Sequence, residues 1–174
     1  MKLFSFDPER IIEILTRHRT RFVIIGGIAG RLWGSTTVTN DLDICYARDR
    51  KNLGALSAAL FELEASLRGA PGGLPFRPDV PTLEAGDHFT FSTNAGSFDC
   101  LATPAGSGGF QDLIAGATEM QIGPARASVV ALEDLMRLKG ATGRAKDRAE
   151  LEILAALKDE IDRARISQPP SHRE

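Results

Sequence analysis

The sequence predicts an α+β fold, in which a mixed, mainly antiparallel sheet carries helices against one face and a helical segment follows at the C-terminal end. Three observations favour this class. A β-branched run at 22–25 leads through two glycines and a short helical pattern to a second apolar run at 41–46. Residues 88–101 alternate between polar and apolar side chains around a turn, as a hairpin does. Residues 131–161 carry apolar side chains at helical spacing.

The length and charge of the chain limit its organisation. Its 174 residues predict a single domain over 1–166, followed by a disordered tail at 167–174 that contains Pro169 and Pro170. Lys and Arg total 21 against 23 Asp and Glu, a formal net charge of −2, so the surface as a whole does not attract nucleic acid. Because there is no signal peptide and no apolar run long enough to span a membrane, we expect a soluble, cytoplasmic protein with no membrane partner.

The first half predicts three helices and a long loop. The segment Asp7-Pro8-Glu9 is typical of a helix start, with an N-cap, a first-turn proline and an early acid. Residues 53–67 place leucines at helical spacing and predict an amphipathic helix that covers the sheet. Residues 68–86 are rich in proline and glycine and predict a mobile loop, or lid, near the mouth of a site. Gly30 interrupts the short central helix, and close packing onto the sheet would explain so small a residue.

The second half predicts strands first and helices last. The expected elements are strands at 88–93 and 97–101, a short helix at 110–117, a hairpin around Gly123-Pro124, and helices at 131–140 and from 144 onward. Cys45 and Cys100 fall in predicted core strands. Two cysteines make no disulfide framework, so we expect buried free thiols.

Two carboxylates lie side by side in the second apolar run. Alternate side chains of a strand face the same way, so Asp41 and Asp43 share one face while Leu42 lies on the other. Neighbouring carboxylates repel, and a bound Mg²⁺ or Mn²⁺ removes that cost because hard cations take oxygen ligands. Gly26 and Gly27 permit a tight turn and expose N–H groups at a helix start, which is an anion site. An NTP chelated to magnesium would satisfy both the carboxylate pair and the anion site.

Asp99 is a third acid in an otherwise apolar strand. Alone, it could be a charged residue that protects a sheet edge. Beside an Asp-x-Asp pair, a third metal ligand is the better interpretation, and a general base for an acceptor hydroxyl is the alternative.

Several short motifs, in their order along the chain, resemble those of the minimal nucleotidyltransferases of the DNA polymerase β superfamily. Members carry a Gly-Gly or Gly-Ser turn, then Asp-x-Asp or Asp-x-Glu, then an acid on a later strand. The branch with AbiEii-type toxins adds a Leu-Glu-Asp-Leu-x-x-x-Lys helix and an Arg-x-Lys-Asp segment. The matching residues lie within about 22–154 and are Gly26-Gly27, Asp41-Leu42-Asp43, Asp99, residues 132–139, and Arg144-Ala145-Lys146-Asp147. The resemblance implies the polymerase β-type nucleotidyltransferase fold.

The resemblance also implies a metal site. Asp41 and Asp43 would hold one Mg²⁺ on the triphosphate, and with Asp99 they would hold a second ion that activates an acceptor hydroxyl. Two positions depart from the family pattern. Gly27 offers no hydroxyl where many members have Ser, and Thr37 stands where many have Arg, so the grip on the nucleotide is expected to differ.

The later motifs imply cationic contacts to the nucleotide. Lys139 would contact phosphate, although its position equally suits a lysine at a helix C-terminus. Asp147 is a candidate catalytic residue by resemblance and a helix N-terminal acid by local sequence. Arg144 and Lys146 would steer a triphosphate or an RNA end.

Together these residues predict an enzyme that moves an NMP from an NTP, such as ATP, to an acceptor hydroxyl. The first hypothesis is a toxin-type enzyme acting on tRNA 3′ ends, with a cognate antitoxin or toxin protein as partner. The alternatives are protein AMPylation, transfer to an aminoglycoside, and an inactive binding relative, against which the three intact acids argue. At this net charge, RNA would need a local basic patch, either Arg144, Lys146 and Arg148 or the basic end formed by Arg17, Arg19 and Arg21.

Overall fold

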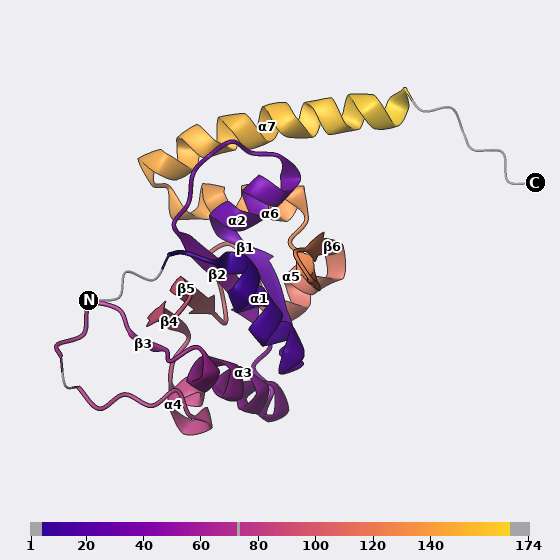
Figure 1. Cartoon of the computed structure of the whole chain (residues 1–174). Coiled ribbons are helices and arrows are strands. Elements are labelled where there is room, and N and C mark those ends of the chain that lie inside the picture. The colour runs from indigo at the N-terminus through magenta and orange to yellow at the C-terminus, as the bar shows by residue number, and fades with distance from the viewer. Residues whose placement is uncertain (1–4, 73, 168–174) are drawn as a thin grey trace, which may run out of the picture.

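Seven strands form one mixed sheet in the part of the chain that the structure describes, residues 5–72 and 74–167 of a computed structural model. The strands are β1 (Phe22–Ile25), β2 (Asp41–Tyr46), β3 (Ser66–Leu67), β4 (His88–Thr93), β5 (Gly96–Leu101), β6 (Thr118–Ile122) and β7 (Ala125–Val129). They lie in the order β3-β4-β5-β2-β1-β7-β6 (Figure 1). The β1–β7 and β2–β5 pairs are parallel and the other four pairs are antiparallel, which confirms a mixed, mainly antiparallel sheet.

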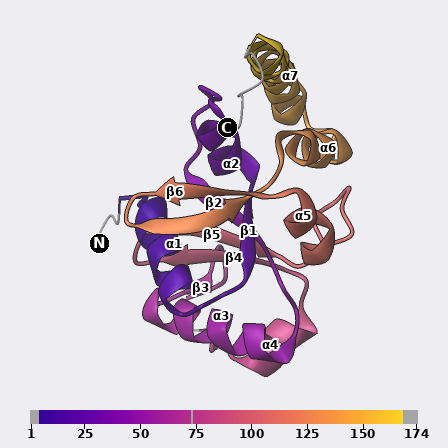
Figure 2. The ribbon, with the colours of Figure 1, turned by 90° about the vertical axis from the view of Figure 1, so that its right-hand side faces the viewer.

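Helices cover both sides of this sheet. They are α1 (Pro8–Arg17), α2 (Gly26–Trp33), α3 (Arg50–Glu62), α4 (Val80–Ala85), α5 (Phe110–Gly116), α6 (Leu132–Thr142) and α7 (Ala145–Ile166). Figure 2 shows α2, α6 and α7 on one side of the sheet and α3 and α4 on the other. The expectation of helices against a single face is wrong, because a second helical layer also covers the face that carries the acids.

Side-chain caps set the starts of α1 and α3. Asp7 Oδ1 accepts a hydrogen bond from the Arg10 N–H at 3.0 Å, so α1 begins where the sequence predicts. Asp49 caps α3 in the same way, and this helix therefore begins earlier than predicted. It also ends earlier, at Glu62, after which the chain turns and forms β3 against β4. The predicted helix over 53–67 is thus wrong at both ends.

The predicted loop at 68–86 contains a helix. Asp79 accepts a hydrogen bond from the Thr82 N–H at 3.1 Å and caps α4, which has a proline in its first turn. Leu83 is fully buried where α4 packs against α3. The loop prediction is wrong over this part because local capping and one buried leucine suffice to form a short helix.

The apolar core fills both sides of the sheet, with side chains of α1 and α3 on one side and of α2 and α6 on the other (Figure 2). Leu42 and Ile44 of β2 are fully buried, and they join the aliphatic side chains of α1 and α3 in one cluster. Cys45 and Cys100 are buried free thiols, as predicted.

The C-terminal helices follow the predicted pattern. Gly143, at φ 65°, separates α6 from α7 in a left-handed conformation that glycine adopts readily. Among the described residues, no helix has the length and apolar character to cross a membrane. The tail predicted at 167–174 lies outside the described residues except for Ser167, which follows α7.

Candidate active site

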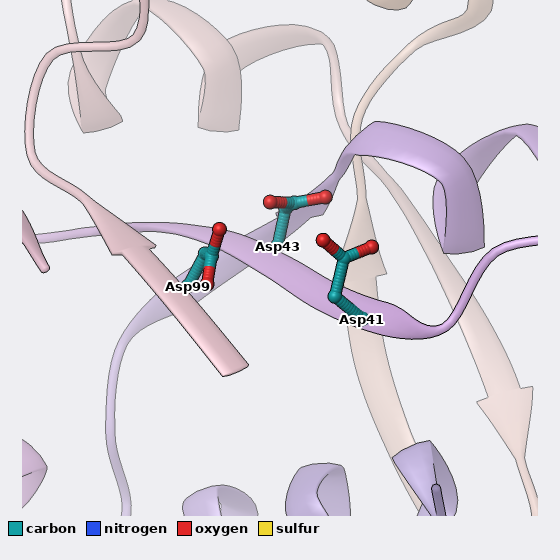
Figure 3. Close-up of side chains that lie close together, drawn as sticks. All are labelled: Asp41, Asp43 and Asp99. Atoms are coloured by element: carbon teal, nitrogen blue, oxygen red, sulfur yellow. The ribbon is translucent and has the colours of Figure 1, made fainter. Parts of the chain in front are cut away.

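Parallel pairing of β2 with β5 brings the three predicted acids together. Asp43 is the Cα partner of Asp99, and Asp41 lies two residues earlier on the same face of β2. One oxygen from each carboxylate lies within 4.8 Å of the others (Figure 3). We call Asp41, Asp43 and Asp99 the acid triad. Its oxygens are close enough to share a metal ion that binds oxygen at roughly 2–2.6 Å.

The acid triad is electrostatically unfavourable by itself. Burial, followed by the charges of Asp41 and Asp99, raises the pKa of Asp43 to about 7. Burial also raises the pKa of Asp99, although the Arg68 guanidinium opposes that effect. A divalent cation would relieve the repulsion, and an all-carboxylate donor set suits Mg²⁺ or Mn²⁺. The residues present therefore fit the expected metal.

Neighbouring side chains orient two of these carboxylates. Thr39 Oγ1 donates to Asp41 Oδ1 at 2.8 Å, from just before β2. Arg68 Nη2 lies 2.6 Å from Asp99 Oδ1 and also donates to the Phe91 carbonyl at 3.0 Å. Sequence reasoning missed Arg68, because only the β3–β4 pairing carries it to the triad.

A side chain at either of the first two residues of α2, Gly26 and Gly27, would collide with a neighbouring side chain. Gly26 has φ +68°, and a Cβ there would lie 2.9 Å from Asp43 Cγ. A Cβ at Gly27 would lie 2.8 Å from Thr39 Cβ, again closer than carbon atoms normally approach. The N-terminus of α2 therefore starts beside Asp43, where its free N–H groups and helix dipole favour an anion.

A second cluster of charges joins α6 to α7 beside the acid triad. Lys139 Nζ lies 2.8 Å from Glu150 Oε2 and 3.4 Å from Asp147 Oδ1. We call Lys139, Asp147 and Glu150 the lysine clamp. Asp147 also accepts hydrogen bonds from Thr142 Oγ1 and from Arg144 Nε, the latter at 2.8 Å. Burial opposes the charge of Asp147, but these hydrogen bonds and the Lys139 ammonium outweigh it and lower its pKa.

Two side chains beside the predicted residues were not anticipated. Glu150 is only 2% exposed and belongs to the lysine clamp. The signal for it was its i, i+3 spacing from Asp147, which places both carboxylates on one face of α7. His88, at the start of β4, lines the cavities of the site. Its sequence position suggested only a strand residue.

Two adjoining cavities open at the acid triad. The smaller, of about 190 Å³, is mainly polar and contains the whole triad, Gly27, Thr37, the lysine clamp, Arg144 and Lys146. The larger, of about 380 Å³, adds apolar side chains from β1, the loop after β5 and α6, namely Ile25, Pro104, Ala105, Leu135 and Leu138. Asp43, His88, Lys139 and Arg144 line both cavities. The predicted site residues therefore meet at one place in the fold.

The basic end of α1 lies elsewhere. Arg17 and His18 contact Glu62, and Arg21 pairs with Asp49. Arg19 and Arg21 line a separate cavity of about 500 Å³ that contains none of the triad. This end is therefore not the basic patch beside the acids.

Comparisons with known proteins confirm the expected fold. No protein-family model and no curated protein sequence matches this chain. The structure resembles that of the lincosamide antibiotic adenylyltransferase LnuA, determined with lincomycin bound. The TM-score is 0.58 at 12% identity, over 88% of this chain and 99% of that one. A weaker likeness, with a TM-score of 0.46 at 14% identity, is to the antibiotic-resistance factor ANT(2'')-Ia, over 92% of this chain and 97% of that one. The first likeness shows that this chain has a nucleotidyltransferase-type fold.

Proposed function

We propose that this protein transfers an NMP from an NTP to an acceptor hydroxyl. The observation that carries the proposal is the acid triad, whose three carboxylates converge within 4.8 Å beside the N-terminus of α2. Lys139, Arg144 and Lys146 line the same cavity and place cations next to the acids, and the Asp147 and Glu150 carboxylates offset part of this charge. A site for a divalent cation beside a site for polyphosphate is what nucleotidyl transfer requires.

Each side chain and backbone group of the site has a role in this reaction. The acceptor oxygen forms a bond to the α-phosphorus while the bond to the bridging oxygen breaks and pyrophosphate leaves. In the alternative assignment, Asp99 takes the hydroxyl proton instead of binding metal, and burial raises its pKa, which suits a base. The free N–H groups of α2 and Lys139 hold the phosphates. Asp147 holds Lys139 and Arg144 in place.

Mg²⁺ or Mn²⁺, when bound by Asp41, Asp43 and Asp99, would neutralise charge on the attacking and leaving oxygens. The raised pKa of Asp43 supports this assignment, because carboxylates that repel each other in a buried cluster favour a cation.

For the acceptor we propose a tRNA 3′ end, in the manner of a toxin-type enzyme with a cognate partner protein. Lys146 and Arg148 are exposed at the start of α7, and Lys146 also lines the smaller cavity. A nucleic-acid end could therefore contact cations while its terminal hydroxyl reaches the triad.

A hydroxylated small molecule is the second candidate acceptor, and the larger cavity favours it. Its volume of about 380 Å³ and its apolar wall, which includes Leu135 and Leu138, suit a compact ligand with an apolar part. An aminoglycoside is more polar than this wall, so a less polar hydroxyl compound fits the cavity better.

The test is to incubate the protein with Mg²⁺ and each NTP labelled at the α-phosphate, together with total tRNA, total protein or a set of hydroxylated antibiotics. We expect label in one acceptor fraction, and none with Asp43→Asn. Asp162→Asn is the matched control, because Asp162 is a surface carboxylate of α7 paired with Lys158. Label in protein would replace the tRNA proposal with AMPylation. Absence of transfer to every acceptor, together with absence of NTP binding, would contradict the proposed function.

A further inference from the structure

Glu150 is a buried carboxylate whose role the proposed reaction does not explain. It is 2% exposed and its Oε2 lies 2.8 Å from Lys139 Nζ. This contact is short but is not aligned as a hydrogen bond, and neither oxygen of Glu150 has a hydrogen-bond partner among the described residues. An isolated buried carboxylate is costly. A purely structural link between α6 and α7 would not need it, since Asp147 already connects the two helices through Lys139.

The position of Lys139 suggests what Glu150 does. A lysine ammonium has three N–H donors. Glu150 and Asp147 lie against two sides of it, and the side chain still lines both cavities of the site. Asp147 accepts one N–H of the ammonium and Glu150 lies against another side of it, so Lys139 is held in place and keeps a donor for the ligand.

Gly30 supplies an independent observation. Its helix would gain from alanine at this position, as glycine is a poor helix former. The nearest atom to a Cβ at Gly30 would be Glu150 Oε1, at 3.0 Å, whereas the next neighbour, Ser35 Cβ, would be 3.6 Å away. The sequence expectation that Gly30 packs closely onto the sheet is therefore wrong. The space left by the missing side chain is used by the Glu150 carboxylate from α7.

We infer that Glu150 is a positioning residue for nucleotide binding. It orients the Lys139 ammonium toward the phosphates, and the absence of a side chain at Gly30 leaves room for its carboxylate. The inference rests on the proposed function, since it concerns the NTP that this function requires. Glu150 touches neither substrate nor metal in this assignment and acts through Lys139.

Calorimetric titration with ATP, CTP, GTP and UTP in Mg²⁺ tests the inference, with the melting temperature measured for each variant. Glu150→Gln keeps the shape of the side chain and removes its charge, and we expect it to raise the NTP dissociation constant roughly five- to ten-fold. Gly30→Ala leaves Glu150 charged but displaces it, and a smaller rise of about two- to three-fold is expected. Because both act through one ammonium, the double variant should bind no more weakly than Glu150→Gln alone.

Asp162→Asn on the same helix is the control and should leave NTP binding unchanged. If Glu150→Gln lowers only the melting temperature while NTP binding stays at the wild-type level, Glu150 is structural and the inference is wrong. Full additivity of the two variants would also overturn it. If Glu150→Gln does not fold, Gly30→Ala is tested in its place. Weaker NTP binding by Gly30→Ala then supports the inference, and unchanged NTP binding overturns it. If the wild-type protein binds none of the four nucleotides, the proposed function is overturned together with the inference. If the wild type binds them and Glu150→Gln binds them equally well, only the inference is overturned.

Discussion

The acid triad holds three half-buried carboxylates and the lysine clamp two buried ones, and the two clusters differ in what neutralises their charge. In the lysine clamp, hydrogen bonds and the Lys139 ammonium outweigh burial and lower the pKa of Asp147. In the acid triad, Asp41 and Asp43 have no ion-pair partner among the residues described, and burial and repulsion raise the pKa of Asp43 to about 7. The charge of Asp147 is therefore neutralised by groups of the protein itself. A divalent cation would neutralise the triad, and this is why we propose it as a binding site rather than a structural ion pair.

Removing one acid from the triad should give the largest effect. Asp43→Asn deletes a metal ligand and relieves repulsion, so we expect nucleotidyl transfer to fall by about 10³-fold or more. The free energy of unfolding without metal should stay the same or rise. Transfer assays and urea unfolding of the same preparations check this. Full turnover of the variant at saturating Mg²⁺ would show that Asp43 is not a metal ligand.

Breaking the lysine clamp should instead cost stability. A lysine at an exposed helix end contributes only about 0.3–1 kcal/mol, which is what the sequence alone suggested. Lys139 is in fact the ion-pair partner of buried Glu150, so Lys139→Ala should destabilise the fold by about 3 kcal/mol and lower the melting temperature by about 6–12 °C. The double variant Lys139→Met with Glu150→Met should recover most of that stability without recovering NTP binding. A melting temperature unchanged by Lys139→Ala would mean that the clamp is not formed in solution.

The pH dependence of stability should separate the two clusters. The folded protein holds the Asp43 proton up to about pH 7, whereas the unfolded chain loses it near 3.8. The stabilisation from this proton is therefore full below about pH 4 and is lost as the pH rises toward 7, by up to about 1.4 kcal/mol per pH unit. Asp147 has a lowered pKa and contributes in the opposite sense, losing its stabilisation as the pH falls. Urea unfolding from pH 4 to 7 should show a steeper decline for the wild type than for Asp43→Asn. Saturating Mg²⁺ should remove the difference, and parallel curves without metal would contradict the assignment.

The smallest expected effect concerns the exposed cations at the start of α7. Arg144 is bound to Asp147, so reversing its charge would disturb the clamp. Lys146→Glu with Arg148→Glu leaves that pair intact. If tRNA is the acceptor, this double variant should bind it a few-fold more weakly, with a salt slope reduced by about 0.7 for each lost phosphate contact. Filter binding across a range of salt concentrations checks the slope. An unchanged slope would favour the small-molecule acceptor.

Local sequence rules were enough to predict the residues at the centre of the site. The strand parity of Asp41 and Asp43 and the turn at Gly26-Gly27 follow from backbone geometry, and the structure places them as expected. Asp99 needed the family resemblance, because nothing local says that β5 pairs in parallel with β2.

The contacts of Arg68 with Asp99 and of Glu150 with Gly30 could not be predicted from the sequence. Arg68 reaches Asp99 only because α3 ends at Glu62 and the chain then forms β3, which was itself predicted as helix. The packing of Glu150 against Gly30 joins helices distant in the sequence. Such contacts depend on how elements pack, and periodicity does not report packing.

The most direct test of the central claim is a titration with Mn²⁺ alone, followed by electron paramagnetic resonance, on the wild type, Asp43→Asn and Glu150→Gln. The acid triad should bind the ion, so Asp43→Asn should weaken Mn²⁺ binding about ten-fold or more, and Glu150→Gln should leave it unchanged. Equal Mn²⁺ affinity in the wild type and Asp43→Asn, or an equal loss in Glu150→Gln, would contradict the claim that the triad is the cation site and the clamp is not.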